Sequence, residues 1–172
     1  MALPNSADQG CSFIGLPQAP TVAPAPIYGQ SDLLMETPMT QRDVVFPAGR
    51  QALYERNRYS PAIRADGFLF VSGQVGSRED GSPEPDLEKQ VRLAFNNLNG
   101  ILRAAGCTFD DVIDVTVFIV DPETKFERIW SVFPEFWGSA PHPTLTGVGV
   151  TWLYGFDFEI KVVARLPQTP AQ

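Results

Sequence analysis

The stretch "DLEKQVRLAFNNLNGILRAAG", residues 86–106, decides the fold, because it is the clearest helix of the chain. Asp86 is a favourable N-cap residue, and Gly106 is a natural stop just past the C-terminal end. The apolar residues between them recur at the spacing of one helix face: Leu87, Val91, Ala94, Leu98, Ile101 and Leu102. A stripe of this length has to be covered by a sheet or by other helices.

The segments that follow this helix predict a strand, a second helix and two closing strands. The turn "TFDD" (108–111) offers a second cap before the strand "VIDVTVFIV" (112–120). Phe126, Ile129, Trp130 and Phe133 share one face of a predicted helix over 123–137, with Pro134 as a kink or stop. The closing strands are "TLTGVGVTWL" (144–153) and "FDFEIKVVARL" (156–166).

The segments before the helix predict a short edge strand and a hairpin. Pro47 ends the edge strand "VVFPAG" (44–49), and Asp66-Gly67 is a strong turn signal between the two apolar runs of 62–74. The predicted order is β-β-β-α-β-α-β-β. We therefore expect an α+β fold, a mixed β-sheet with two helices on one face.

The central strand predicts self-association. Ile113, Val115, Val117 and Ile119 alternate onto one face of 112–120, yet Phe118 and Val120 make the other face apolar as well. Two helices cover only one side of a sheet. Another copy of the chain is the most economical cover for the second side.

The N-terminal residues 1–39 differ in composition from the rest of the chain. They carry six prolines and no Lys or Arg, and they show no helical or alternating period. Proline-rich segments of this kind favour an extended, solvated chain. We predict a disordered tail over 1–39 and one folded domain over 40–172.

The composition of the 172 residues disfavours several classes of protein. A formal net charge of -7 with scattered basic residues argues against a nucleic-acid partner. One histidine and two cysteines, Cys11 and Cys107, leave almost no ligands for a zinc site and no disulfide framework. No signal peptide or membrane span is evident, so we expect a cytoplasmic protein without a membrane partner.

Three stretches resemble the RidA/YjgF family, also called the L-PSP endoribonuclease family, and are closest to its YjgH-like branch. They are "RYSPAIRADGFLFVSGQVG" (58–76), "AFNNLNGILRAAGCTFDDVIDVTVFIVD" (94–121) and "FDFEIKVVARLP" (156–167). The resemblance implies a chorismate-mutase-like fold and a homotrimer with clefts between its subunits. It also implies hydrolysis of 2-imino or enamine acids to 2-keto acids and ammonia, with no cofactor and no metal.

The resemblance also implies the residues of the site. Tyr59 and Glu159 correspond to the family's catalytic tyrosine and water-holding glutamate, and Gly73 to a glycine whose backbone faces the ligand. Thr144 stands where the family has the arginine that clamps the substrate carboxylate, and Trp130 stands where it has an asparagine. A threonine hydroxyl replaces neither the charge nor the fork of a guanidinium. The remaining substrate-binding candidates are Thr146 and His142.

Each candidate also has a purely structural interpretation. Glu159 alternates with apolar residues, so on spacing alone it is a solvated strand glutamate, and Tyr59 alone is a packing aromatic. His142 lies between two prolines and is either an inert loop residue or a source of partial positive charge near the lost arginine. The tryptophans Trp130 and Trp152 are typical of a core, and Cys107 of a partly buried structural thiol.

Two functions from different classes remain open. The first is a deaminase-like hydrolase of imines, enamines or related C=N small molecules, favoured by Tyr59, Gly73 and Glu159. The alternative is a non-catalytic trimeric protein that binds or senses a small molecule, favoured by Thr144 and Trp130. An endoribonuclease activity rests only on a family name, and the acidic charge of the chain weighs against it.

Overall fold

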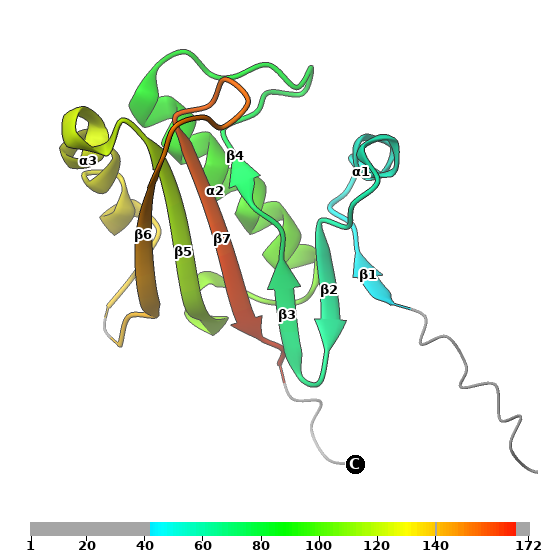
Figure 1. The fold of residues 1–172 in the computed structure, drawn as a ribbon. Helices are drawn as coiled ribbons and strands as arrows, with labels where there is room; N and C mark the ends of the chain where they lie inside the picture. Colours follow the sequence, from blue (N-terminus) through cyan, green and yellow to red (C-terminus); the bar gives the residue numbers. More distant parts are fainter. Residues whose placement is uncertain (1–41, 140, 168–172) are drawn as a thin grey trace, which may run out of the picture. The chain divides into compact units, whose positions relative to one another are not determined.

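The computed structural model describes residues 42–139 and 141–167. Within these ranges seven strands form one mixed sheet, whose main path has the order β1-β2-β3-β7-β5-β6, while β4 pairs with β7 (Figure 1). Only β5 and β6 are parallel neighbours. The strands are β1 (Asp43–Val45), β2 (Ala62–Ala65), β3 (Phe68–Val71), β4 (Gln74–Val75), β5 (Val112–Val120), β6 (Thr144–Val150) and β7 (Phe158–Arg165). The predicted tail over 1–39 lies outside the described residues.

The long helix α2 (Leu87–Ala104) passes behind the sheet in Figure 1. Asp86 caps it, since a carboxylate oxygen accepts a hydrogen bond from the Lys89 amide at 3.0 Å. All six residues of the predicted stripe are buried, together with Phe95, and Gly106 follows the helix with a φ of +81°. The predicted helix and both of its end signals are confirmed.

The core lies between the sheet and the helices α2 and α3 (Pro122–Trp130). Every second residue of β7 is buried on this side: Phe158, Ile160, Val162 and Ala164. The predicted hairpin is confirmed, with Asp66 and Gly67 both at positive φ between β2 and β3. The predicted α+β class is therefore correct.

One helix and one short strand, α1 and β4, are not among the elements predicted from the sequence. The helix α1 (Gln51–Asn57) follows Pro47, so the expectation of two helices was wrong and the described residues form three. Its N-cap residue, Arg50, makes no side-chain cap, the first turn has no acidic residue, and Tyr54 is its one buried side chain. A helix is normally predicted from a side-chain cap, acidic residues in the first turn and a stripe of buried residues, and α1 lacks all three.

Two further expectations were wrong in detail. Ile113 does not alternate with the core residues of β5, because a β-bulge between Val112 and Asp114 turns it outward and leaves it 38% exposed. Trp152 is not a core residue. It lies in the connection between β6 and β7, is 62% exposed and packs against Tyr154, with ring centroids 4.0 Å apart.

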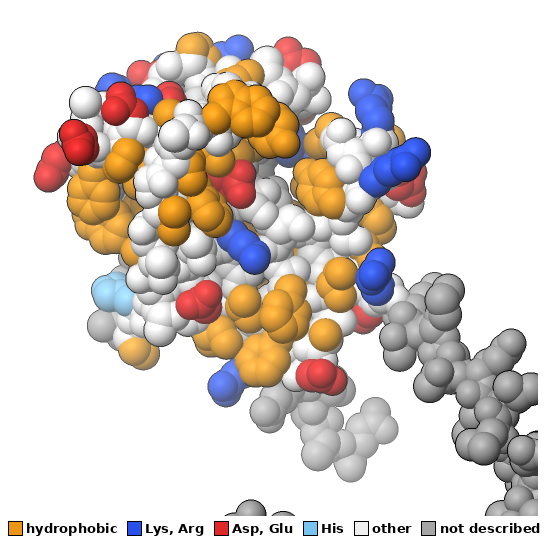
Figure 2. Space-filling view, in the orientation of Figure 1, with side chains coloured by type: hydrophobic (Ala, Val, Ile, Leu, Met, Phe, Trp, Pro, Cys, Tyr) orange, Lys and Arg blue, Asp and Glu red, His pale blue; other side chains and the backbone are white. Residues whose placement is uncertain are grey.

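The second face of the sheet carries apolar side chains that neither α2 nor α3 covers. Phe118, Val120 and Val163 are partly buried there, and Phe70 is 49% exposed. Figure 2 shows hydrophobic side chains spread over this face and interrupted by a few charged ones. An apolar sheet face of this kind is typical of a protein–protein interface.

Candidate functional site

Glu159 lies on β7 and points away from the core, as its alternation with buried neighbours predicts. Its side chain occupies the space beside Gly73, because a Cβ added to Gly73 would overlap the Glu159 carboxylate. Partial burial raises the pKa of Glu159 above its ordinary value, and the nearby charge of Lys161 lowers it by less. The structure thus brings together two of the predicted site residues and makes the carboxylate more basic than a solvated one.

Tyr59, in the segment between α1 and β2, is the third residue of this group. It follows Arg58, the C-cap residue of α1, and its ring packs edge-on against the buried ring of Tyr54 at 5.1 Å. Burial raises the pKa of Tyr59, and the negative charge of Glu159 raises it further. The Tyr59 hydroxyl therefore lies within electrostatic reach of the Glu159 carboxylate and stays protonated at neutral pH.

Gln90 holds the start of β7 in place, a role that the sequence analysis missed. This buried side chain donates to the Glu84 carbonyl oxygen at 2.7 Å, and its own oxygen accepts from the Asp157 amide at 2.7 Å. Asp157 immediately precedes β7, so Gln90 ties the strand that carries Glu159 to α2. A buried glutamine on the apolar side of a helix was the available signal, because a buried amide needs partners.

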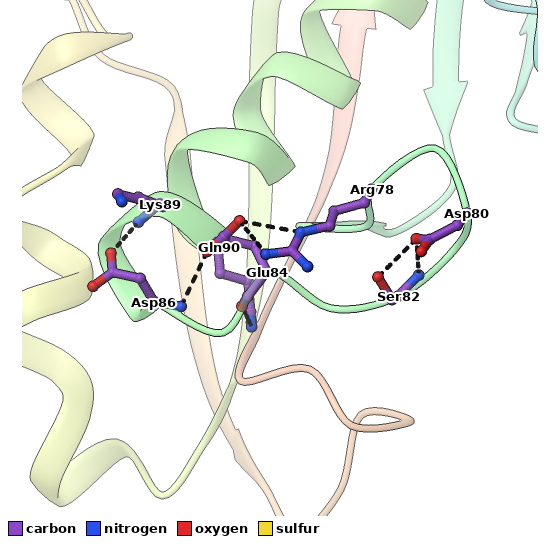
Figure 3. A network of polar contacts seen from close by, with 7 residues as sticks. All are labelled: Arg78, Asp80, Ser82, Glu84, Asp86, Lys89 and Gln90. Atoms are coloured by element: carbon purple, nitrogen blue, oxygen red, sulfur yellow. Dashed lines mark hydrogen bonds and ion pairs between the residues drawn. The ribbon is translucent and has the colours of Figure 1, made fainter.

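The loop before α2 is ordered by its own polar contacts (Figure 3). Arg78 and Glu84 form an ion pair at 2.9 Å, and Asp80 accepts hydrogen bonds from the amide and hydroxyl of Ser82. The arginine is the main cause that lowers the pKa of Glu84. These contacts hold the loop next to Gly76, whose missing side chain lets the backbone of Gln90 approach.

Thr144 lies at the start of β6, on the same face of the sheet as Glu159, with its hydroxyl paired within the chain. Its Oγ1 atom lies 2.5 Å from the Asp114 carboxylate and 3.1 Å from the Ile113 carbonyl oxygen. Asp114 therefore places a negative charge where the resemblance leads one to expect an arginine. A carboxylate ligand is repelled at this position rather than clamped.

The register of the sheet separates Thr144 from Glu159. Glu159 pairs with Phe118, which pairs with Val148, four residues beyond Thr144. With strands about 4.8 Å apart and a rise of about 3.3 Å per residue, the Cα atoms of Thr144 and Glu159 are about 16 Å apart. Thr146 lies two residues closer to Glu159 along β6, and it pairs with Thr116, which pairs with Lys161. One small ligand does not span this distance within one copy of the chain.

Trp130 and His142 lie together, but on the other side of β6. They line a cavity of about 360 Å³ with Phe133, Trp137 and Leu145. Leu145 pairs with Val115, which belongs to the helix-side core, so the cavity opens on that side. In Figure 2 the single histidine, in pale blue, lies beside a hydrophobic patch at the edge of the molecule. The predicted site residues thus form three groups: Tyr59, Gly73 and Glu159 in one, Trp130 and His142 in another, and Thr144 and Thr146 along β6 in the third.

Comparison with known proteins identifies the family. The family model described as Endoribonuclease L-PSP matches residues 49–166. The chain belongs to this family. It is 64% identical to the RutC family protein YjgH of Escherichia coli over 130 residues, which are 76% of this chain and 99% of that protein. This identity agrees with the predicted YjgH-like branch.

Two further comparisons concern the fold and a named activity within the L-PSP family. A solved structure titled protein YJGH matches with a TM-score of 0.71 and 64% identity, covering 74% of this chain and 98% of that one. The mouse 2-iminobutanoate/2-iminopropanoate deaminase is 38% identical over 65 residues, which are 37% of this chain and 48% of the mouse protein. The name of the mouse protein gives it a deaminase activity on 2-iminobutanoate and 2-iminopropanoate.

Residues 42–139 and 141–167 contain neither a metal-binding cluster nor a helix that could span a membrane. No group of three or more His, Cys, Asp or Glu side chains gathers there as a metal site. None of the helices in these ranges is long and apolar enough to cross a membrane. Cys107 is buried and its pKa is raised by that burial, so it is a structural thiol rather than a nucleophile, as predicted.

Proposed function

We propose that this protein is a deaminase-like hydrolase of imines, enamines or related C=N small molecules. One observation carries the proposal: the Glu159 carboxylate lies over Gly73, within electrostatic reach of Tyr59, with a raised pKa. A general base works best when its pKa is near the operating pH, and partial burial moves Glu159 in that direction. The deaminase named among its relatives supports the same chemistry.

In this mechanism Glu159 holds a water molecule against the carbon of the C=N bond. The water oxygen attacks that carbon while its proton passes to the Glu159 carboxylate and the C=N π electrons move to nitrogen. Tyr59, which stays protonated, donates a hydrogen bond to the nitrogen. Glu159 then returns this proton to the nitrogen, which gives a carbinolamine. The carbinolamine hydroxyl proton next passes to Glu159 as the C=O bond forms, and Glu159 delivers it to the nitrogen as the C–N bond breaks, so the carboxylate is ionised again. One water is consumed and one ammonia is released, without a cofactor.

We infer that the complete cleft forms between copies of the chain, in a homotrimer. The estimated separation of about 16 Å between Thr144 and Glu159 supports this, since a second copy can bring its own β6 next to Glu159. The uncovered apolar face around Phe70 and Phe118 supports self-association as well. Thr146 is then a contact from the partner, while Asp114 keeps Thr144 from acting as a carboxylate clamp.

The test is a screen of imines in competition with semicarbazide, with the 2-imino acids made in situ by an amino-acid oxidase and the imines without a carboxylate by an amine oxidase. An active enzyme lowers the yield of semicarbazone in proportion to its concentration. Substrates with and without a carboxylate are compared, because Asp114 predicts a preference for those whose carboxylate does not approach β6. The absence of any turnover across the panel would contradict the hydrolase.

The alternative is a trimeric binding protein without turnover, and the Thr144–Asp114 pair is the observation that favours it. Under this alternative, the 2-keto acid and ammonia form no faster than in buffer, yet a small molecule stabilises the protein against heat. Thermal-shift measurements on the same panel distinguish the two functions.

A further inference from the structure

A second, polar groove lies between α1, the segment before it and α2. Its volume is about 510 Å³, within the range of small-molecule sites. Pro47, Ala48 and Arg50 come from the segment before α1. The other lining residues are Tyr54 on α1 and Asn96, Asn97, Gly100, Arg103 and Ala104 on α2 or at its end. Glu159, Gly73 and Tyr59 do not line it, although Arg50 also acts electrostatically on Tyr59.

The groove is positively charged in a protein of net charge -7. Arg50 and Arg103 line it, and no Asp or Glu does. Neither arginine forms an ion pair in the part of the chain that the structure describes, whereas Arg64, Arg78, Arg92 and Arg128 each pair with a carboxylate. Two like charges that line one groove favour an anion bound between them.

The walls of the groove are held in place before any ligand binds. Arg50 donates from Nη2 to the carbonyl oxygens of Ser77 and Arg78, at 3.4 Å each. Asn97 donates to the carbonyl oxygens of Val75 and Ser77. The loop after β4 therefore fixes the Arg50 and Asn97 side chains, and a donor fixed in advance loses less entropy when it binds a ligand.

Gly100 is an independent indication that the groove is kept open. Glycine inside a helix is less stable than alanine, so it needs a reason. Packing does not give one, because a Cβ added to Gly100 would meet no heavy atom closer than 3.9 Å, an ordinary contact with Pro47. Its effect is to leave room in the groove, between Asn96 and Arg103 on the same face of α2.

We propose that this groove binds a phosphorylated small molecule. Two guanidinium groups balance the charge of a phosphate dianion and match the geometry of its oxygens. A single carboxylate needs only one guanidinium, so the pair of arginines favours a phosphate. The phosphate lies between Arg50 and Arg103, and the Asn96 amide supplies a further donor. The small apolar surfaces of Pro47 and Ala48 contact the rest of the ligand.

The test is calorimetric titration of phenyl phosphate into the full-length protein in a phosphate-free buffer. Wild type should bind with a Kd of about 1 mM or lower. Arg103→Gln should weaken binding at least tenfold, and Gly100→Leu should do the same by filling the groove without removing charge. Arg128→Gln is the matched control, since it removes an exposed arginine of α3 outside the groove and should leave the Kd unchanged.

Circular dichroism spectra identical to that of wild type verify that the variants fold. Weaker binding with Arg103→Gln and Gly100→Leu alone would support the groove as the site. Equal Kd values for wild type and Arg103→Gln, or no binding by wild type at millimolar phenyl phosphate, would overturn the proposal.

Discussion

Substituting Gly73 and Gly76 by alanine should separate activity from stability. Both glycines lie on or beside β4, and neither has a positive φ, so alanine can adopt either backbone conformation. An added Cβ at Gly73 overlaps the end of the Glu159 side chain, whereas at Gly76 it overlaps the carbonyl group of Gln90 inside α2. A side chain can rotate away from the new methyl group, but the backbone of a packed helix cannot.

The expected magnitudes follow from this difference. Gly73→Ala should change the free energy of unfolding by less than about 1 kcal/mol, since restricting the unfolded chain offsets the local crowding. It moves the Glu159 carboxylate by an ångström or more, which for an oriented reaction costs about 100-fold in rate. Gly76→Ala should cost about 1–3 kcal/mol of stability, a fall in Tm of roughly 3–12 °C.

The assay combines thermal unfolding with C=N hydrolysis for both variants and wild type. Each variant is the control for the other, because the substitution is the same. Full activity in Gly73→Ala would refute the role of the Glu159 position. An unchanged Tm in Gly76→Ala would refute the close packing of this loop on α2.

Four further results are expected. The folded-state pKa of Glu159 is raised, so wild type loses stability as the pH rises from about 4.3 through that pKa. In urea titrations, Glu159→Gln should therefore be more stable than wild type at pH 7 and equally stable below about pH 4. Lys161 lowers the Glu159 pKa, so Lys161→Gln should move the acid limb of the pH–rate profile to higher pH, and an unmoved limb would count against Glu159 as the base. Thr144→Arg should gain little activity on 2-imino acids, because Asp114 neutralises the new guanidinium, while adding Asp114→Asn should release it; equal rates for the single and double variants would exclude this pairing. Light scattering should report a trimer at micromolar concentration, and a stable monomer would contradict the cleft between copies.

The sequence predicts the parts of the fold that rest on strong local signals. The cap at Asp86, the stripe of α2, the Asp66-Gly67 turn and the alternation in β7 are all confirmed. Each depends on residues near one another in the chain. The alternation in β7 was by itself enough to predict that the Glu159 side chain points away from the core.

The features that the sequence does not predict depend on tertiary contacts. Helix α1 has one buried residue and no side-chain N-cap, so it is held by packing around Tyr54 rather than by its own propensity. The bulge that exposes Ile113 has no local signature within the apolar run of β5. The pairing of Thr144 with Asp114 depends on the register of two parallel strands, which no motif encodes.

The sequence does not predict how the candidate site residues are arranged. Tyr59, Gly73 and Glu159 lie together, as the resemblance implies, but Trp130 and His142 line a cavity on the other side of β6. The sequence also offered His142 as a replacement for the missing positive charge. In the structure, Lys161 is the cation whose charge acts on Glu159.

The most direct test of the central claim is the release of ammonia from imines with and without a carboxylate, generated in situ and compared between wild type, Glu159→Gln and buffer. If Glu159 holds and deprotonates the attacking water, wild type should accelerate the release above the buffer rate, and Glu159→Gln should reduce this catalysed rate by about 10- to 1000-fold. The variant should remain folded and at least as stable as wild type at pH 7. Equal catalysed rates for wild type and Glu159→Gln, or a wild-type rate equal to that of buffer, would contradict the account.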